Sequence, residues 1–125
     1  MAATTDELAA AFGALLVTGE PASITEHLAP GAVVWHNHDR IDVDAIDNMA
    51  SVAVLGELVD DLSVEHRLLA STPDGFVLQF VTLGTVRSNG KPFEMHNCIV
   101  VTRGDDGRIT RIDEYVDPTV GAQLT

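Results

Sequence analysis

The densest group of hydrogen-bonding side chains in the chain lies at residues 33–39, VVWHNHD. The group begins with two β-branched apolar residues, which favour a pleated, half-buried strand. A strand that passes from core residues into imidazole and amide groups is placed to line the floor of a pocket. The same pattern is also typical of a strand end that runs into a polar surface loop. In a pocket, His36 would be suited to moving protons near neutral pH.

Glu114 is the carboxylate that could work with this imidazole. Ile112 and Val116 lie two residues away on either side of it, so in a strand all three side chains share one face. A carboxylate and an imidazole paired in an apolar pocket form a workable acid/base device. We therefore predict His36 as a general base, with Glu114 orienting the imidazole or serving as the acid. A structural ion pair between Glu114 and an arginine such as Arg111 is the alternative.

A metal site is the other chemistry that these residues could support. His36, His38 and Asp39 are metal-ligating types, and an i, i+2 pair at a strand end can bind zinc. Strand alternation separates the two histidines from intervening ligands, however, and the sequence specifies no third ligand. We therefore predict neither metal nor cofactor. Cys98 is interpreted as a small buried hydrophobic residue rather than a nucleophile.

Length and charge limit the class of protein. A chain of 125 residues is long enough for one domain, residues 1–125, that buries a core without disulfides or metal. Its net charge of −12 argues against nucleic acid as a partner, because a phosphate backbone needs a basic patch. The sequence shows no leader and no apolar run near the roughly 20 residues that span a bilayer, so a soluble, cytoplasmic protein without membrane partners is expected.

Helical signals fill the first half of the chain and strand signals the second. Thr4 and Glu7 have the spacing of a capping box, which predicts a helix to about Gly19. Pro21 suits the first turn of a short second helix. A third helix is predicted within residues 42–56, and four strands, separated by turn signals, within residues 62–71, 76–87, 93–103 and 108–116. The expected fold is α+β: three N-terminal helices packed on a curved, mostly antiparallel sheet that encloses a cavity.

Two of these strands are apolar on both faces. In residues 76–83, FVLQFVTL, both alternate sets are largely apolar, and residues 99–101, IVV, repeat the pattern. The strands of an antiparallel sheet with one solvent-exposed face should instead alternate apolar with polar residues. We therefore predict that one face covers the helices and a cavity while the outer face forms a homodimer.

This order of elements resembles the SnoaL-like branch of the nuclear transport factor 2-like superfamily. The branch is related to ketosteroid isomerases, polyketide cyclases and limonene epoxide hydrolase. The most specific pieces are Trp35-His36-Asn37 and residues 107–117, GRITRIDEYVD, and the resemblance covers essentially the whole chain. It implies a cone-shaped α+β barrel around a cavity, and usually a dimer. Such families include enzymes of several chemistries and proteins with none, so the fold alone does not decide activity.

The resemblance places different side chains at the functional positions of these relatives. In the isomerase register, the oxyanion-hole tyrosine falls on Phe12, the neutral carboxylic acid on Ile99 and the general-base aspartate on His36. The arginine and aspartate of the epoxide hydrolase fall on Phe80 and Thr82, which cannot protonate an epoxide or activate water. Neither chemistry is therefore expected in its usual form.

The same comparisons imply which side chains face the cavity. The implied lining residues are Phe80, Thr82, Met95, Asn97, Ile99, Ile112, Glu114 and Val116. Phe12 and Met49 would complete apolar walls suited to a small hydrophobic ligand, and a plain packed core is the alternative. Asn97 could orient a carbonyl or hydroxyl of the ligand, or serve as a structural amide.

The register of the first strand is open at this point. Counting along the isomerase register turns His36 inward, with Val34 on the same side. Matching the aromatic-x-Asn motif of the hydrolase instead turns Trp35 and Asn37 inward, where they would hold a water molecule. A shift of one residue exchanges the two sets. We favour His36.

The predicted function is a cofactor-independent enzyme that acts on a small hydrophobic molecule. His36 and Glu114 would move the proton, and Asn97, with Asn37 or Trp35, would position substrate or water. Isomerisation, cyclisation and hydrolytic addition are the candidate reactions. A non-catalytic ligand-binding or dimerisation module of the same fold is the alternative.

Overall fold

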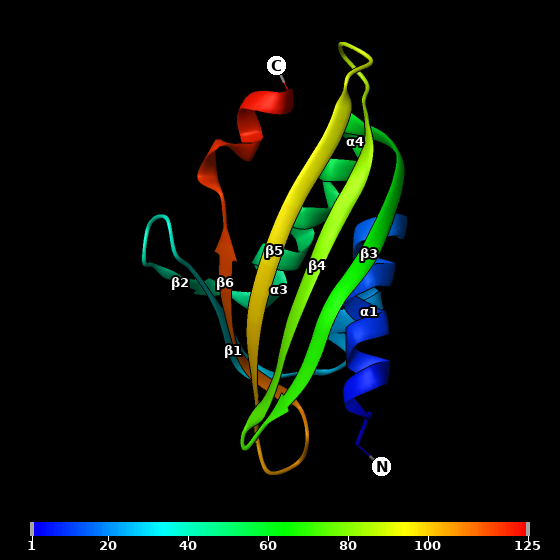
Figure 1. Cartoon of the computed structure of the whole chain (residues 1–125). Coiled ribbons are helices and arrows are strands. Elements are labelled where there is room, and N and C mark those ends of the chain that lie inside the picture. The colour runs from blue at the N-terminus through cyan, green and yellow to red at the C-terminus, as the bar shows by residue number, and fades with distance from the viewer. Residues whose placement is uncertain (1, 125) are drawn as a thin grey trace.

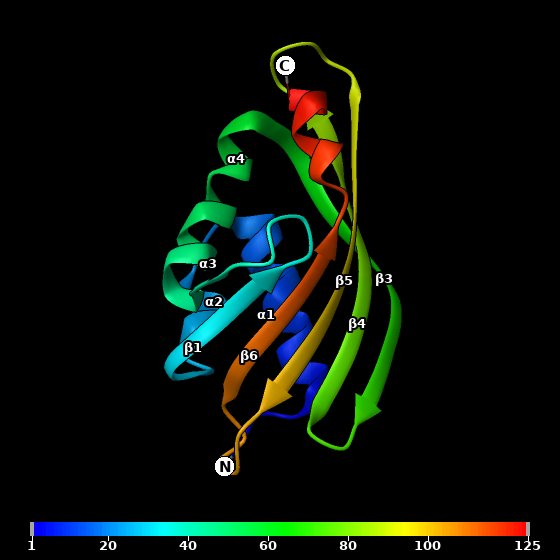
Figure 2. The ribbon, with the colours of Figure 1, turned by 90° about the vertical axis from the view of Figure 1, so that its left-hand side faces the viewer.

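A curved sheet with helices against its inner face makes up the fold (Figures 1 and 2). The computed structural model describes residues 2–124. Its helices are α1 (Thr5–Thr18), α2 (Ala22–Thr25), α3 (Ala45–Ala53), α4 (Leu55–Leu58) and a C-terminal 3-10 helix, η1 (Pro118–Leu124). Its strands are β1 (Leu28–His36), β2 (Asp42–Asp44), β3 (Val59–Thr72), β4 (Gly75–Val86), β5 (Pro92–Arg103) and β6 (Ile109–Val116). The predicted α+β class is confirmed.

The strand order places β1, from the first half of the chain, beside β6, the last strand. The sheet runs β2-β1-β6-β5-β4-β3, and it is open because β2 and β3 are its edges. Strands β3 to β6 form an antiparallel meander, whereas β1 lies parallel to β6. In that parallel pair, Val34 stands opposite Ile112 and His36 opposite Glu114. The long-range pairing of β1 with β6 therefore positions the two predicted acid/base residues.

Helix α1 follows its sequence signals closely. Thr4 and Glu7 form the predicted capping box, and Gly19 ends the helix with a φ of 70°, a left-handed conformation that glycine adopts without strain. The buried face consists of Leu8, Ala9, Phe12, Leu15 and Leu16, and it packs in the main core against the inner face of the sheet. None of the helices in residues 2–124 is long and apolar enough to cross a membrane.

Four local features differ from expectation. The second helix has only four residues, and β1 starts already at Leu28. Its ladder with β6 is interrupted between Leu28 and Val33, where Pro30 lacks an N–H to donate. Residues 42–44 pair with β1 as a strand, so the third helix begins later, with Asp44 accepting a hydrogen bond from the Asp47 N–H at 3.1 Å. Helix η1 was not predicted.

A smaller core lies at the end of the sheet nearest η1. Val59, Val86 and Phe93 are buried there, and Val120 and Leu124 of η1 pack against them. The side-chain amide of Gln123 also makes two hydrogen bonds to the backbone of Glu94 on β5, at 2.9 and 3.1 Å. The C-terminal helix is thereby held against the sheet, at the same end of the molecule as α4 (Figure 2).

Gly75 is the position where a single methyl group should damage the sheet most directly. A Cβ there would lie 1.9 Å from the backbone oxygen of Val101, and no side-chain rotation relieves a clash with backbone. We expect Gly75→Ala to destabilise the protein by about 1–3 kcal/mol or more, measured by chemical denaturation.

Gly56→Ala is the matched control, because a Cβ at Gly56 meets nothing within 4 Å. Its stability should be unchanged or slightly higher, since alanine favours a helix over glycine. Equal stability of the two variants would show that the strands β4 and β5 separate at Gly75 without cost.

Candidate active site

A cavity of about 350 Å³ lies between the helices and the inner face of the sheet. Seven predicted apolar residues line it: Phe12, Met49, Phe80, Met95, Ile99, Ile112 and Val116. Within residues 2–124, no lysine, arginine or aspartate is among its lining residues, and Glu114 is the one acidic side chain there. The lining of the cavity is therefore mostly apolar, with few polar side chains.

His36, Glu114 and Asn97 form a hydrogen-bonded chain in this cavity. Nε2 of His36 lies 2.9 Å from Oε1 of Glu114, and the two side chains are only 15% and 20% exposed. Nδ2 of Asn97 donates to the other carboxylate oxygen, Oε2, at 3.2 Å. Each oxygen of Glu114 is thus engaged by one neighbour, an arrangement in which the carboxylate can orient the imidazole.

The surroundings of His36 favour its protonated form. The hydrogen bond with Glu114 raises the pKa of His36 above 6.5, and the charges of Glu114 and Asp39 add to the rise, while burial opposes it. With Nε2 held by the carboxylate, Nδ1 has no hydrogen-bond partner among the described residues. A neutral His36 in this arrangement keeps its proton on Nε2 and offers the lone pair of Nδ1 as a base.

The structure resolves the register of β1 in favour of His36. Trp35 and Asn37 lie on the outer face, so their predicted place in the cavity is corrected. The Trp35 ring packs edge-on against Tyr115 with centroids 5.5 Å apart, and Oδ1 of Asn37 accepts a hydrogen bond from the Val116 N–H at 3.0 Å. Strand alternation explains the outcome, because turning His36 inward turns both of its neighbours outward.

Thr82 also departs from its predicted place. It stands opposite Met95, which lines the cavity, but Thr82 itself is fully buried and does not reach the cavity surface. Its hydroxyl has no hydrogen-bond partner among the described residues.

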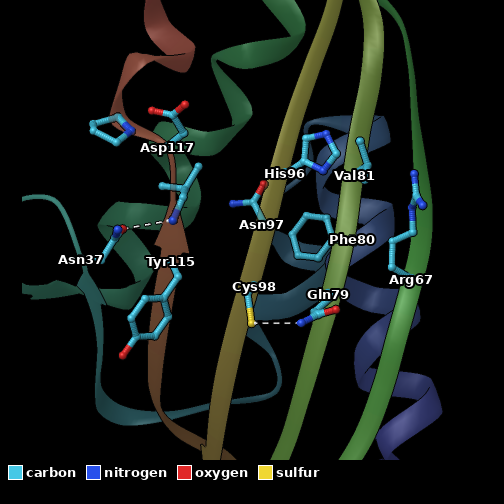
Figure 3. Close-up of a pocket in the computed structure, with 12 residues that line it drawn as sticks. Asn37, Arg67, Gln79, Phe80, Val81, His96, Asn97, Cys98, Tyr115 and Asp117 are labelled. Atoms are coloured by element: carbon cyan, nitrogen blue, oxygen red, sulfur yellow. Dashed lines mark hydrogen bonds between the residues drawn. The ribbon is translucent and has the colours of Figure 1, made fainter.

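A second depression, of about 530 Å³, lies on the outer face of the sheet. Figure 3 shows side chains around it that include Arg67, Gln79, His96 and Tyr115. Cys98 faces this side and is half-buried, rather than buried as predicted, with Sγ 4.0 Å from the Gln79 amide nitrogen. The imidazole and carboxylate in contact on this face, His96 and Glu94, are both more than half exposed, so the inner cavity is the better candidate for an active site. Residues 2–124 contain no group of three His, Cys, Asp or Glu placed to hold a metal ion.

Some lining residues were not found from the sequence. His38 lies beside His36, with ring centroids 5.4 Å apart, and Asn48 and Ser51 come from α3. Val120 and Leu124 of η1 close one side. Their i, i+4 spacing after Pro118 is a helical signal that could have indicated a short C-terminal helix.

Comparisons with known proteins identify the fold. No protein-family model matches the sequence, and no curated protein matches it. Among solved structures, IdmH from Streptomyces antibioticus, a proposed polyketide cyclase, has a TM-score of 0.77 and 22% identity, with 98% of this chain and 99% of that chain covered. A protein from Catenulispora acidiphila with a ketosteroid isomerase-like fold, in complex with trimethylamine, has a TM-score of 0.75 and 16% identity, with 97% and 94% covered.

An NTF2-like protein from Burkholderia thailandensis has a TM-score of 0.73 and 22% identity, with 98% of this chain and 97% of that chain covered. These identities are low, while the coverage is nearly complete on both sides. The likeness therefore concerns the fold, and this chain has the nuclear transport factor 2-like, ketosteroid isomerase-like α+β fold.

Proposed function

We propose that the protein is a cofactor-independent enzyme that moves a proton on a small hydrophobic molecule. The observation that carries this proposal is the 2.9 Å contact between His36 and Glu114 inside a largely apolar cavity. A cavity of about 350 Å³ is near the lower end of the range of ligand pockets, about 300–1,000 Å³, so the substrate is compact.

In the proposed mechanism His36 is the general base and Glu114 its positioning partner. Nδ1 takes a proton from a carbon next to a carbonyl, and the electron pair moves onto the carbonyl oxygen. The imidazolium that forms is stabilised by the negative charge of Glu114. Return of the same proton to another carbon completes an isomerisation, and attack of the carbanion on a second carbonyl followed by protonation completes a cyclisation. Abstraction from water would instead begin a hydrolytic addition.

Proton exchange tests the proposal without knowledge of the natural substrate. We expect the protein to speed the incorporation of deuterium from D₂O next to the carbonyl of small cyclic ketones, followed by NMR. Free imidazole at the same concentration is the control for uncatalysed and buffer-catalysed exchange. If no ketone, epoxide or alcohol in a broad screen reacts although some bind saturably, the protein is a binding module instead.

That second candidate, a non-catalytic ligand-binding module, has an observation of its own. Phe12, Phe80 and Ile99 line the cavity at positions where the resembling enzymes carry reactive groups. The carboxylate that remains, Glu114, is satisfied internally. A binding module predicts ligand affinity that is unchanged when His36 is removed, with no turnover in either protein.

We also propose that the outer sheet face forms a homodimer. Val81 on that face is buried, Val77, Leu83 and Val100 are half-buried, and Tyr115 is 47% exposed in the single chain. Light scattering at micromolar concentration should give the mass of a dimer. Val100→Asp should give a monomer, because the interface would bury an unpaired charge.

Ile46→Asp is the control for the dimer, because Ile46 is 59% exposed on α3, on the helical side of the sheet. This variant should remain a dimer. A monomeric wild-type protein would contradict the proposed interface.

A further inference from the structure

Two buried polar atoms in the structure have no partner. Thr82 is 0% exposed and Asn97 is 6% exposed, yet neither Oγ1 of Thr82 nor Oδ1 of Asn97 has a hydrogen-bond partner among the described residues. Buried polar atoms in proteins are nearly always hydrogen-bonded. A buried donor or acceptor without a partner has lost its hydrogen bonds to water and gained none in their place, which costs free energy. Two such atoms on neighbouring strands of one sheet face suggest a ligand group that meets both.

The strand register places Thr82 and Asn97 diagonally across the neighbouring strands β4 and β5. Thr82 stands opposite Met95 in the pairing of β4 with β5, and Asn97 stands opposite Phe80. All four side chains point to the inner face, so Thr82 and Asn97 form the diagonal of one four-residue unit. The Cβ atoms of a diagonal pair are about 7–8 Å apart or somewhat closer. The side chains of Thr82 and Asn97 extend from these Cβ atoms, so the distance that one ligand atom between their oxygens must bridge is shorter.

The direction of the Asn97 amide follows from its neighbour. A carboxylate only accepts hydrogen bonds, so the amide nitrogen faces Oε2 of Glu114 and the amide oxygen faces away. The site therefore offers one acceptor, Oδ1 of Asn97, and one hydroxyl that can donate, on Thr82.

We propose that Thr82 and Asn97 form a subsite for a hydroxyl group of the substrate. The ligand O–H donates to Oδ1 of Asn97, and the ligand oxygen accepts from the Thr82 hydroxyl. This inference rests on the proposed function in taking the inner cavity as the place where substrate binds. The natural substrate is then a small, uncharged, hydrophobic molecule that carries a hydroxyl group in addition to the carbonyl of the proposed reaction.

Other ligand groups match these atoms less well. A ketone or ether oxygen only accepts, so it would leave Oδ1 of Asn97 unmet. A carboxylate or phosphate would lie near Glu114, and no lysine or arginine among the described residues lines the cavity to balance it. A hydroxyl both donates and accepts, and it brings no charge.

Met95 controls access to this subsite. It is the cross-strand neighbour of Thr82 and lies two residues from Asn97 on the same face of β5. Met95 lines the cavity where Thr82 does not, so its side chain separates the Thr82 hydroxyl from the cavity. An unbranched thioether with three rotatable bonds can move aside for a ligand far more easily than the ring of Phe80.

The test compares three probes of similar shape: cyclohexanol, cyclohexanone and cyclohexyl methyl ether. Their affinities are measured by NMR titration of the full chain, for the wild type, Thr82→Val and Thr82→Ser. We expect the wild type to bind cyclohexanol more tightly than the two acceptor-only probes by about 5- to 10-fold, which corresponds to one hydrogen bond to a buried group. Thr82→Val should weaken the binding of all three probes, because it removes the hydroxyl from which each ligand oxygen accepts, and Thr82→Ser should bind them as the wild type does.

Several results would overturn the subsite. Equal binding of the three probes to the wild type would mean that the two atoms hold structural water only, and no binding at all would exclude the hydroxyl site outright. An unchanged affinity for cyclohexanol in Thr82→Val would do the same. If Thr82→Val does not fold, Met95→Ala provides the second measurement, because opening the subsite should maintain or increase the preference for cyclohexanol and its loss would contradict the proposal.

His36→Ala separates this inference from the proposed catalysis. The subsite predicts that this variant keeps the preference for cyclohexanol. If the preference holds and no substrate is turned over by the wild type, the hydroxyl site stands and the proposed reaction fails. If turnover is found but the preference is absent, only the subsite is wrong.

Discussion

His36→Ala should lower turnover by about 10²–10⁴-fold, the usual contribution of a general base. The expected loss is large because Glu114 cannot replace this imidazole as a base, and His38, the other histidine of the cavity, lies beside Asp39 and makes no contact with Glu114. Both oxygens of Glu114 are already bonded, one to His36 and one to Asn97. The measurement is the initial rate of proton exchange or of conversion for any substrate found by screening.

His96→Ala is the matched control for the loss of a histidine. His96 lies on the outer face and is 64% exposed on its side chain, where it pairs with Glu94 at 3.2 Å. Its replacement should leave turnover within about twofold, since surface substitutions away from a site change little. Full turnover in His36→Ala, with the variant shown to be folded by thermal denaturation, would remove this histidine from the mechanism.

Glu114→Gln should produce the second large effect, a fall in both the pKa of His36 and the rate. Glutamine keeps the shape of the side chain and can still accept a hydrogen bond from Nε2, but it carries no charge. The hydrogen bond and charge of Glu114 are what raise the pKa of His36 above 6.5, and burial pulls it down. With the charge gone, we expect the pKa to fall to 6.5 or lower and the rate to fall by about 10²-fold or more, because the imidazolium loses its stabilising partner.

The direction of the pH dependence follows from the base role. Turnover needs neutral His36, so it rises with pH through the pKa of His36, which in the wild type lies above 6.5. In Glu114→Gln this rise should move to lower pH. NMR titration of the His36 ring gives the pKa directly, and a titration curve that Glu114→Gln does not move would show that the carboxylate leaves the imidazole unaffected.

The free energy of unfolding should also depend on the protonation of His36, but it should fall with rising pH where turnover rises. Because the folded-state pKa of His36 is raised, the charged pair stabilises the protein fully below pH 6.5. This stabilisation is lost as the pH rises through the folded-state pKa. The contribution of His36 to the pH dependence of unfolding should therefore disappear in Glu114→Gln if its pKa falls to 6.5, and reverse in sign if the pKa falls lower, which denaturation across this pH range can check.

The parts of the fold that the sequence predicted well are those specified by neighbours in the chain. The capping box of Thr4 and Glu7 and the left-handed Gly19 bound α1 through contacts within a few residues. The turn at Asn89-Gly90 likewise ends β4, with Gly90 at a φ of 71°. Short-range chemistry of this kind is read directly from residue types.

The parts that could not be predicted depend on contacts between distant segments. Nothing near His36 in the sequence indicates that β1 lies parallel to β6, yet this pairing turns His36 inward and Trp35 outward. The resemblance to a family suggested the pair with Glu114, and only the register of the two strands distinguishes it from a shift of one residue. The hydrogen bond from Asn97 is a similar case, since it depends on the pairing of β5 with β6.

The parallel pairing of β1 with β6 also ties the candidate active site to the completion of folding. His36 and Glu114 are 78 residues apart in sequence and meet only when the first and last strands of the sheet join. The meander from β3 to β6 can form from neighbouring hairpins, whereas docking β1 closes a far longer loop and is entropically the more expensive step. A partly folded chain with only the meander in place would have a carboxylate but no base beside it. Acid/base activity would therefore serve as a marker of chains that have folded completely.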